Sequence, residues 1–275
     1  MADPINLSSS VRTNLLTLQR TSGFIADTQT RLSTGLRVNT ALDDAAAFFT
    51  AKGLSDTATD FDALKSNIDL AISTIQTAID GIDAISELVN QAKGLASNAK
   101  ATGNTSERST LAVQFNELLS QINTIANDSS FNGTNLLQAT PDNLAVEFNT
   151  DNTSNLTITG LDSTTATSGI NIAVAANNFG LNANIDTALT AISSALTTLR
   201  SNASTMGSRN TILSTRLEFT DNLVNTLEGG TGKLTLADLN EESANLLALQ
   251  TRQQLGINSL ALAAQSERSI LALFG

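Results

Sequence analysis

The chain has 275 residues and a formal net charge of −11, and it contains no Cys, His, Trp or Tyr. Without Cys or His there are no disulfides, no zinc sites built on those ligands, and no Ser-His-Asp triad or Cys nucleophile. Catalysis by paired carboxylates is still chemically possible, but no pair of acidic residues stands out in the sequence.

The charge is unevenly distributed along the chain. Residues 1–52 hold five basic and four acidic residues, and residues 229–275 hold three basic and four acidic ones, so residues 53–228 account for the net charge of −11. An acidic surface repels nucleic acid and anionic lipid, so we expect neither as a partner. The nearly neutral ends are rich in Leu and Ala and suit burial against copies of the same chain.

The first residues have neither the basic segment nor the apolar core of a cleavable signal peptide. No apolar run reaches the roughly 20 residues of a membrane span. If the protein is secreted, we therefore expect a route that does not read such a signal.

Helical periodicity begins near the start of the chain. A helix is predicted over residues 7–32, where apolar residues recur every three or four positions as in a coiled coil. Gly35 is an expected stop for this helix. Thr40 and Asp43 resemble a capping box that starts a new helix, and a further long helix is predicted over residues 57–100.

The pattern then changes. Gly103-Asn104 breaks the helix, and Thr105 or Ser106 is expected to cap the next one. From residue 128 to about residue 184 the composition shifts to Asn, Thr, Ser, Gly and Asp. Asn132-Gly133 is typical of a type I′ hairpin, and strand-like alternation occurs at 144–148, 156–159 and 170–174. We interpret this part as a small β-hairpin region exposed to solvent.

The clearest periodicity follows. From Ile185 to Leu227 apolar residues keep a four–three spacing over six heptads, with polar Asn210 and Thr220 at two of the positions. This is typical of a long coiled-coil helix, which we expect to end at the glycines of 229–232. A last helix is predicted over residues 236–274, with apolar residues on two sides.

The terminal helices pose a physical problem. The three central helices can bury their stripes in one antiparallel bundle, but a monomer would leave apolar surface of the two terminal helices exposed. Identical copies can cover such a surface through a head-to-tail contact that does not close, and this generates a helical filament. We favour a filament over a closed dimeric coiled coil.

Three motifs resemble those of bacterial flagellins. Residues 31–47 (RLSTGLRVNTALDDAAA) resemble the N-terminal signature of that family, residues 130–137 (SFNGTNLL) its turn after the first bundle, and residues 256–275 (GINSLALAAQSERSILALFG) its closing helix. The motifs occur in the expected order, and the helical pattern fills the chain between them.

The resemblance implies a mainly α fold: a long antiparallel coiled-coil helical bundle with a small β-hairpin region in the middle of the chain, and terminal helices that pair as a coiled coil. It also implies five parts. These are an N-terminal inner-tube helix (1–43), the N-terminal half of the bundle (44–135), a short β-rich exposed insert (136–184), the C-terminal half of the bundle (185–228) and a C-terminal inner-tube helix (229–275).

The implied function is that of a structural subunit that self-assembles into the flagellar filament for motility, with no enzyme activity and no cofactor. Expected partners are further copies of the chain, the flagellar type III export apparatus, a flagellin chaperone, the filament cap and the hook-junction proteins. The expected location is the extracellular filament. A hook–filament junction protein and a secreted coiled-coil scaffold unrelated to flagella are the alternatives.

Two sets of residues are expected to carry assembly. Those expected to pack inside the tube are Val11, Leu15, Leu18, Ile25, Leu260, Ala264, Leu271 and Phe274. Those expected to hold the corner between the layers of the filament are Gly35, Arg37, Asn39, Thr40, Asp43 and Asp44.

Overall fold

The computed structural model describes the backbone of residues 9–274 and the side chains of that range except 267 and 270–274. The chain divides into two compact units, one formed by Met1–Thr57 with Thr226–Gly275 and the other by Ala58–Asn225. The mainly helical fold, with a small β region in the middle of the chain, confirms the predicted fold class.

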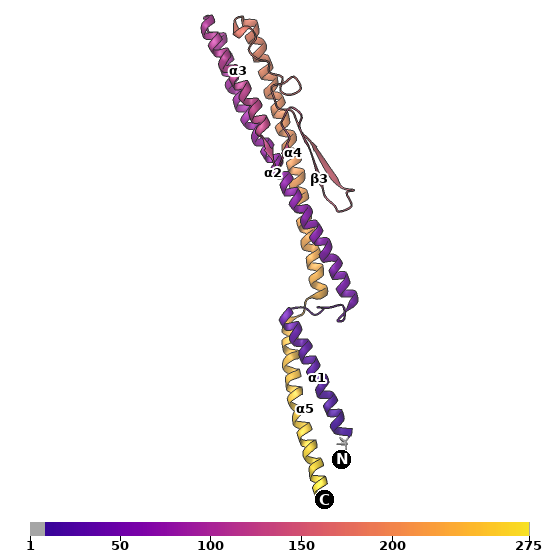
Figure 1. Ribbon diagram of the computed structural model, residues 1–275. Helices are drawn as coiled ribbons and strands as arrows, with labels where there is room; N and C mark the ends of the chain where they lie inside the picture. The colour runs from indigo at the N-terminus through magenta and orange to yellow at the C-terminus, as the bar shows by residue number, and fades with distance from the viewer. Residues whose placement is uncertain (1–8, 275) are drawn as a thin grey trace, which may run out of the picture. The chain divides into compact units, whose positions relative to one another are not determined.

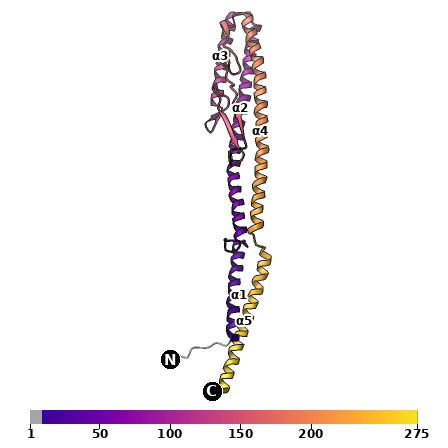
Figure 2. The ribbon, with the colours of Figure 1, turned by 90° about the vertical axis from the view of Figure 1, so that its right-hand side faces the viewer.

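The unit that holds both ends of the chain is built on α1 (Ser9–Thr34) and α5 (Leu239–Phe274). The two helices lie side by side and antiparallel (Figures 1 and 2). Gly35 has a φ of +72°, and its N–H donates to the carbonyl of Arg31 at 2.8 Å. Glycine adopts this left-handed conformation without a Cβ clash, so the predicted stop is confirmed.

Two of the helices are unusually long. α2 (Ala45–Ala101) has 57 residues and α4 (Asn182–Thr235) has 54, which gives lengths of about 85 Å and about 80 Å. α3 (Thr105–Asp128) lies beside the upper part of α2 in both views (Figures 1 and 2). The cap of α3 is Asn104, whose Oδ1 accepts the Ser106 N–H at 3.0 Å. The predicted caps, Thr105 or Ser106, were therefore wrong by one or two residues.

A continuous apolar core joins α2, α3 and α4 within Ala58–Asn225. The predicted heptads of α4 supply its inward face, and the fully buried members are Ile185, Ile192, Leu199, Met206 and Leu213. Burying each such side chain stabilises the fold by about 1.5–3 kcal/mol. The register predicted from the sequence is confirmed.

The two polar positions of that register behave differently. Thr220 is buried, and its hydroxyl donates to the carbonyl of Arg216 at 2.9 Å, so the helix itself satisfies it. Asn210 buries its Oδ1 with no hydrogen-bond donor among the described residues. A polar residue at such a position limits the registers in which neighbouring helices can pack.

A short hairpin follows α3. β1 (Ser130–Phe131) pairs with β2 (Thr134–Asn135), and Asn132 and Gly133 between them have φ values of 49° and 80°. Positive φ at both central residues is the requirement of a type I′ turn, so the predicted hairpin is confirmed.

The larger hairpin is made by β3 (Asn143–Glu147) and β4 (Asn155–Thr159), which pair antiparallel with Val146 opposite Leu156. Both were predicted, within one residue at each end. Val146 and Ile158 are buried against the helices, whereas their neighbours along each strand are more exposed. This alternation is that of a sheet with one buried face.

Two expectations for this region are wrong. Residues 170–174 form no strand, because local turns occupy their N–H groups: Ile170 donates to Thr164 at 2.8 Å and Ile172 to Thr165 at 3.1 Å. The region is also not simply exposed, since it contributes side chains to the core. The buried ones are Val146, Phe148, Ile158, Ile170, Ile172, Ala175 and Phe179.

The short 3-10 helix η1 (Ala176–Phe179) returns the chain to α4. Its last residue, Phe179, is fully buried, and its ring meets the edge of Phe115 on α3 with the centroids 5.2 Å apart. Edge-to-face pairs of this kind are favourable beyond the area they bury.

Two further expectations about helix ends are corrected. The start of α2 is capped by Asp44, whose Oδ1 accepts the Ala47 N–H at 3.0 Å, and not by Thr40 and Asp43. One continuous helix then runs on through Thr57, where we had predicted a separate start. A cap four residues after the expected Thr40 therefore begins a helix of 57 residues.

The glycines of 229–232 do not end α4, which continues to Thr235. A Cβ on Gly230 would lie 3.3 Å from Leu54 Cδ1, and the hydroxyl of Thr231 donates to the carbonyl of Leu227 at 3.1 Å. Helical hydrogen bonding and close packing against α2 thus outweigh the low helix propensity of glycine.

Candidate functional site: the paired terminal helices and their connection

The seam between α1 and α5 contains buried polar residues beside its apolar ones. Thr21 and Thr28 on α1 are 3% and 6% exposed, and Glu242 on α5 is 7% exposed. Arg31 donates from Nη1 to Glu242 Oε1 at 3.1 Å, which joins one end of α1 to the start of α5. The hydroxyl of Thr21 donates to the carbonyl of Thr17 at 2.9 Å. Thr21, Arg31 and Glu242 therefore have hydrogen-bond partners, but these polar groups add little apolar burial to the pair.

The residues that we predicted to pack inside the tube lie mostly along this seam. Val11 is 7% exposed, and four others are half-buried: Leu18, Ile25, Leu260 and Ala264. Leu15 is 38% exposed and lies outside the seam. The side chains of Leu271 and Phe274 are outside the described residues.

The outer surface of the pair carries apolar side chains that no other described residue covers. Leu262 is 72% exposed, Leu247 67% and Leu255 62%. Further exposed members of this surface are Leu16, Phe24, Leu239 and Ile257. The sequence had indicated the second apolar side of α5, but Leu16 and Phe24 were missed. A search for every large apolar residue off the four–three spacing of α1 would have found them.

The segment from Gly35 to Asp44, which connects α1 to α2, is held mainly by backbone hydrogen bonds to the end of α4. Leu36 and Leu236 form an antiparallel bridge, and the Arg37 N–H donates to the carbonyl of Thr235 at 2.7 Å. Arg37 Nη2 donates to the carbonyl of Leu234 at 3.0 Å. A guanidinium that binds the last carbonyls of α4 both satisfies them and opposes the negative end of the helix dipole.

A tight turn follows, centred on the Asp43 carboxylate. Its Oδ2 accepts the Thr40 N–H at 2.8 Å, the Asn39 N–H at 3.1 Å and the Thr40 hydroxyl at 3.1 Å. The hydrogen bonds from the Thr40 and Asn39 backbone hold the pKa of Asp43 below its ordinary value of 3.8. The six predicted corner residues lie within one short stretch of the sequence, from Gly35 to Asp44, and their role at the joint between filament layers stays a prediction.

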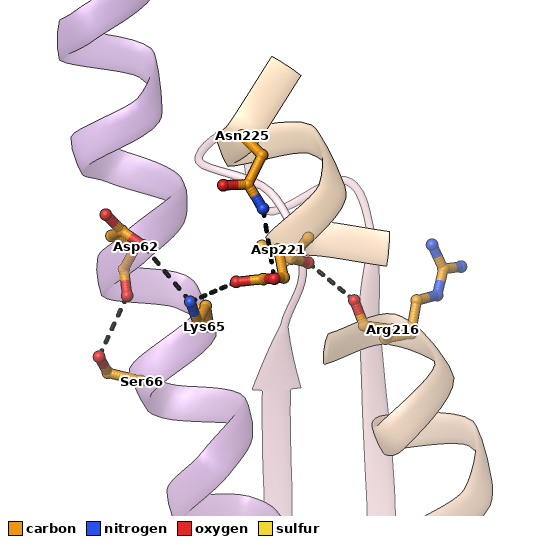
Figure 3. A network of polar contacts seen from close by, with 7 residues as sticks. Asp62, Lys65, Ser66, Arg216, Asp221 and Asn225 are labelled. Carbon is orange, nitrogen blue, oxygen red and sulfur yellow. Dashed lines mark hydrogen bonds and ion pairs between the residues drawn. The ribbon is translucent and has the colours of Figure 1, made fainter. Parts of the chain in front are cut away.

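A polar contact also joins the bundle helices. Lys65 Nζ of α2 lies 2.5 Å from Asp221 Oδ1 of α4 and 3.9 Å from Asp62 Oδ1. Figure 3 shows the Asp221 carboxylate directed at Lys65, with Asn225 donating to it from one turn along α4. The predictions from the sequence did not include this pair, because it joins residues 156 positions apart.

The described residues offer little for other chemistry. They contain no group of three or more His, Cys, Asp or Glu side chains placed to hold a metal ion. None of the helices in the described part of the chain is long and apolar enough to cross a bilayer. The distinctive features among the described residues are therefore the exposed apolar surface of the α1–α5 pair and the hydrogen-bonded segment from Gly35 to Asp44.

Two family models match separate parts of this chain. The bacterial flagellin N-terminal helical region matches residues 5–142, and the bacterial flagellin C-terminal helical region matches residues 189–274. Flagellin FljM of Caulobacter vibrioides is 35% identical over 277 residues, which cover 98% of each chain. The chain belongs to the bacterial flagellin family.

A second relative agrees. A flagellin of Brucella melitensis is 31% identical over 276 residues, covering 97% of each chain. Among solved structures, the crystal structure of Bacillus cereus flagellin aligns with a TM-score of 0.49 and 21% identity, covering 56% of this chain and 88% of that one. Of the functions that the sequence left open, the matches to both flagellin regions support the structural subunit of the flagellar filament.

Proposed function

We propose that this flagellin builds the filament through the outer apolar surface of the α1–α5 pair, packed against further copies in an inner tube. The exposed leucines of α5 carry the proposal. Fully burying one such side chain stabilises the assembly by about 1.5–3 kcal/mol. Several such residues on one pair of helices would make a strong association surface.

The contrast between the seam and the outer surface of the pair supports packing of the outer surface against other copies. Thr21, Thr28 and the Arg31–Glu242 ion pair lie inside the pair, whereas Leu255 and Leu262 lie outside it. An isolated pair of helices gains most by placing leucines inside and hydroxyls outside. Leaving leucines such as Leu255 and Leu262 on the outside is favourable when neighbouring subunits surround the pair.

The connection from Gly35 to Asp44 is proposed to hold the joint between the inner tube and the layer outside it. Its hydrogen bonds to the end of α4, and those to Asp43, fix the path of the chain between α1 and α2. The division into the parts 1–43, 44–135, 136–184, 185–228 and 229–275 belongs to the same proposal.

We propose the remaining roles from the resemblance to flagellins. The subunit has no catalytic function, leaves the cell through the flagellar type III export apparatus, and joins the extracellular filament. A flagellin chaperone shields the C-terminal helix before export, and a cap folds arriving subunits at the filament tip next to hook-junction proteins. The unpartnered leucines of α5 are the surface that such a chaperone would cover.

The test uses the full chain and sheared filaments as seeds. Leu255→Asp with Leu262→Asp places two charges on the outer surface without entering the seam, so the monomer should keep its circular dichroism and unfolding profile. We expect seeded growth to be lost, because an unpaired charge is costly to bury. Leu255→Met with Leu262→Met is the matched control and should extend seeds normally. Growth of the Asp variant at the wild-type rate would contradict the proposal.

A further inference from the structure

Charge is segregated between the two long bundle helices. Between residues 187 and 217, α4 contains Arg200, Arg209 and Arg216 and no acidic residue. Between residues 66 and 92, α2 contains four acidic residues and no basic one. In a chain with a net charge of −11, a basic stretch of this length is unusual and suggests a specific partner.

The basic stretch has an apolar border. Ile212 and Phe219 are 40% and 59% exposed, and each follows an arginine by three positions, which places the two types side by side on α4. We call Arg209, Ile212, Arg216 and Phe219 the basic face. Figure 3 shows the Arg216 side chain on the side of α4 away from Lys65, and its guanidinium lies 4.9 Å from the centre of the Phe148 ring.

The acidic residues of α2 also share one face. Asp69, Asp80, Asp83 and Glu87, which we call the acidic stripe, follow the three- and four-residue steps of a helix surface, and all four are exposed. The core residues Ile75, Ile82 and Ile85 lie on the opposite side and are fully buried or nearly so. The stripe therefore points away from the bundle.

Neither surface is neutralised within the chain. Among the described side chains, Arg209 and Arg216 have no carboxylate within 4.0 Å, and the acidic stripe has no basic group within that distance. The ion pairs between α2 and α4 lie beyond both surfaces, at Lys65–Asp221 and Lys100–Asp186.

We propose that the basic face of one flagellin docks on the acidic stripe of a second copy. The spacings agree, because Arg209 and Arg216 are seven residues apart, as are Asp80 and Glu87, and seven helical residues span about 10.5 Å. Ile72 and Ile79, also seven apart and half-buried, border the stripe as Ile212 and Phe219 border the arginines. Two helices in contact can therefore match both charges and both apolar residues at one register.

This inference rests on the proposed filament and assigns a contact to the bundle that is independent of the terminal helices. Exposed ion pairs contribute modestly to affinity, but they fix register and speed encounter. The proposed contact thus determines how neighbouring bundles align, while the apolar terminal helices supply most of the burial.

Charge reversal gives a test with an internal rescue. Arg209→Glu with Arg216→Glu makes both surfaces acidic, and Asp80→Arg with Glu87→Arg makes both basic. We expect each double variant alone to extend wild-type seeds at least about tenfold more slowly than the wild type. An equimolar mixture of the two should recover to within about threefold, because each then meets an opposite charge.

Arg200→Glu is the matched control. It makes the same Arg-to-Glu substitution on α4 at one position, which is half the charge change of the double variant. Arg200 is nine residues from Arg209 and lies half a turn round the helix, so this variant should extend seeds like the wild type. Circular dichroism of each monomer establishes its fold. If a reversed variant does not fold, Arg209→Gln with Arg216→Gln takes its place. This neutral variant should extend seeds more slowly than the wild type, and mixing it with another variant should not restore the rate.

The outcomes separate the two proposals. Wild-type growth by either reversed double variant alone, or a mixture that grows no faster than its components, would overturn the docking of basic face on acidic stripe. Failure of the wild-type chain to extend its own seeds would overturn the proposed filament function, and this contact with it.

Discussion

The ammonium of Lys65 on α2 lies 2.5 Å from the carboxylate of Asp221 on α4, so an ion pair bridges the two longest helices. This hydrogen bond lowers the pKa of Asp221 below its ordinary 3.8 and raises the pKa of Lys65 above its ordinary 10.5. Both groups are held in their charged forms in the folded state. The stability of the bundle therefore depends on the ionisation of this pair.

Asp221→Asn should lower the unfolding temperature at neutral pH, by no more than about 3 °C because both side chains are partly exposed. A lowered aspartate pKa adds stability above pH 3.8 that disappears as the pH falls through the folded pKa. The difference between the variant and the wild type should therefore vanish in acid, and the wild type should also lose this contribution above pH 10.5. Thermal unfolding followed by circular dichroism across pH checks this, and a difference that persists at pH 2 would refute it.

Gly81→Ala should destabilise the bundle by about 1–3 kcal/mol through overpacking. A Cβ there would lie 2.3 Å from Ser129 Oγ and 2.8 Å from Leu137 Cδ1, at the point where α2 meets the chain that follows α3. Denaturant unfolding of the monomer measures the change.

Gly94→Ala on the same helix is the matched control. No atom lies within 4 Å of its added Cβ, so it should stabilise the chain by about 0.5–1 kcal/mol by reducing the freedom of the unfolded state. Equal effects of the two substitutions would show that helix propensity, and not the close approach at Gly81, determines the outcome.

Asp43→Ala should loosen the connection between α1 and α2. The Asn39 and Thr40 N–H groups would lose their shared acceptor, and their hydrogen exchange should become at least about tenfold faster. Asp43→Asn keeps a side-chain oxygen and should show a smaller change. Unchanged exchange in the Ala variant would mean that other contacts hold this turn.

Leu18→Asp should separate α1 from α5 and stop filament growth. Leu18 faces Gly256 across the seam, where an added Cβ would lie 2.8 Å from Leu18 Cδ1, so a carboxylate at this position has no room for its hydration shell. Leu260→Asp should act in the same way from α5. The Ala58–Asn225 unit should keep its unfolding transition, because Leu18 is no part of its core. Normal filaments from either variant would count against the assignment.

The long helices of this fold were predictable because apolar residues repeated over many heptads fit only one helical register. Residues on the four–three spacing of α4, such as Ile192 and Leu199, lie in the core as expected. Short-range geometry was less accessible. The strand expected at 170–174 fails because its N–H groups close local turns, and whether Gly230 ends a helix depends on its contact with Leu54.

The candidate site was predictable in outline and not in detail. Two-sided apolarity identified the terminal helices, but the seam between them uses Thr21 and Thr28, whose hydroxyls gave no signal of burial in the sequence. Leu15 belongs to an apolar spacing but is 38% exposed. When the apolar pattern of a helix is weak, the side that faces the neighbouring helix depends on the side chains of both helices. The apolar pattern of one helix does not contain the information about the other.

The hydroxyl-lined seam of the α1–α5 pair has a thermal consequence. A hydrogen bond there contributes only about 0.5–1.5 kcal/mol net, so we expect a lone subunit to hold these helices weakly and to gain stability from the copies proposed to surround them. Warming a polymer of this chain should therefore shed subunits and melt the chain ends in one calorimetric event, and the bundle residues 58–225 should melt separately at a higher temperature.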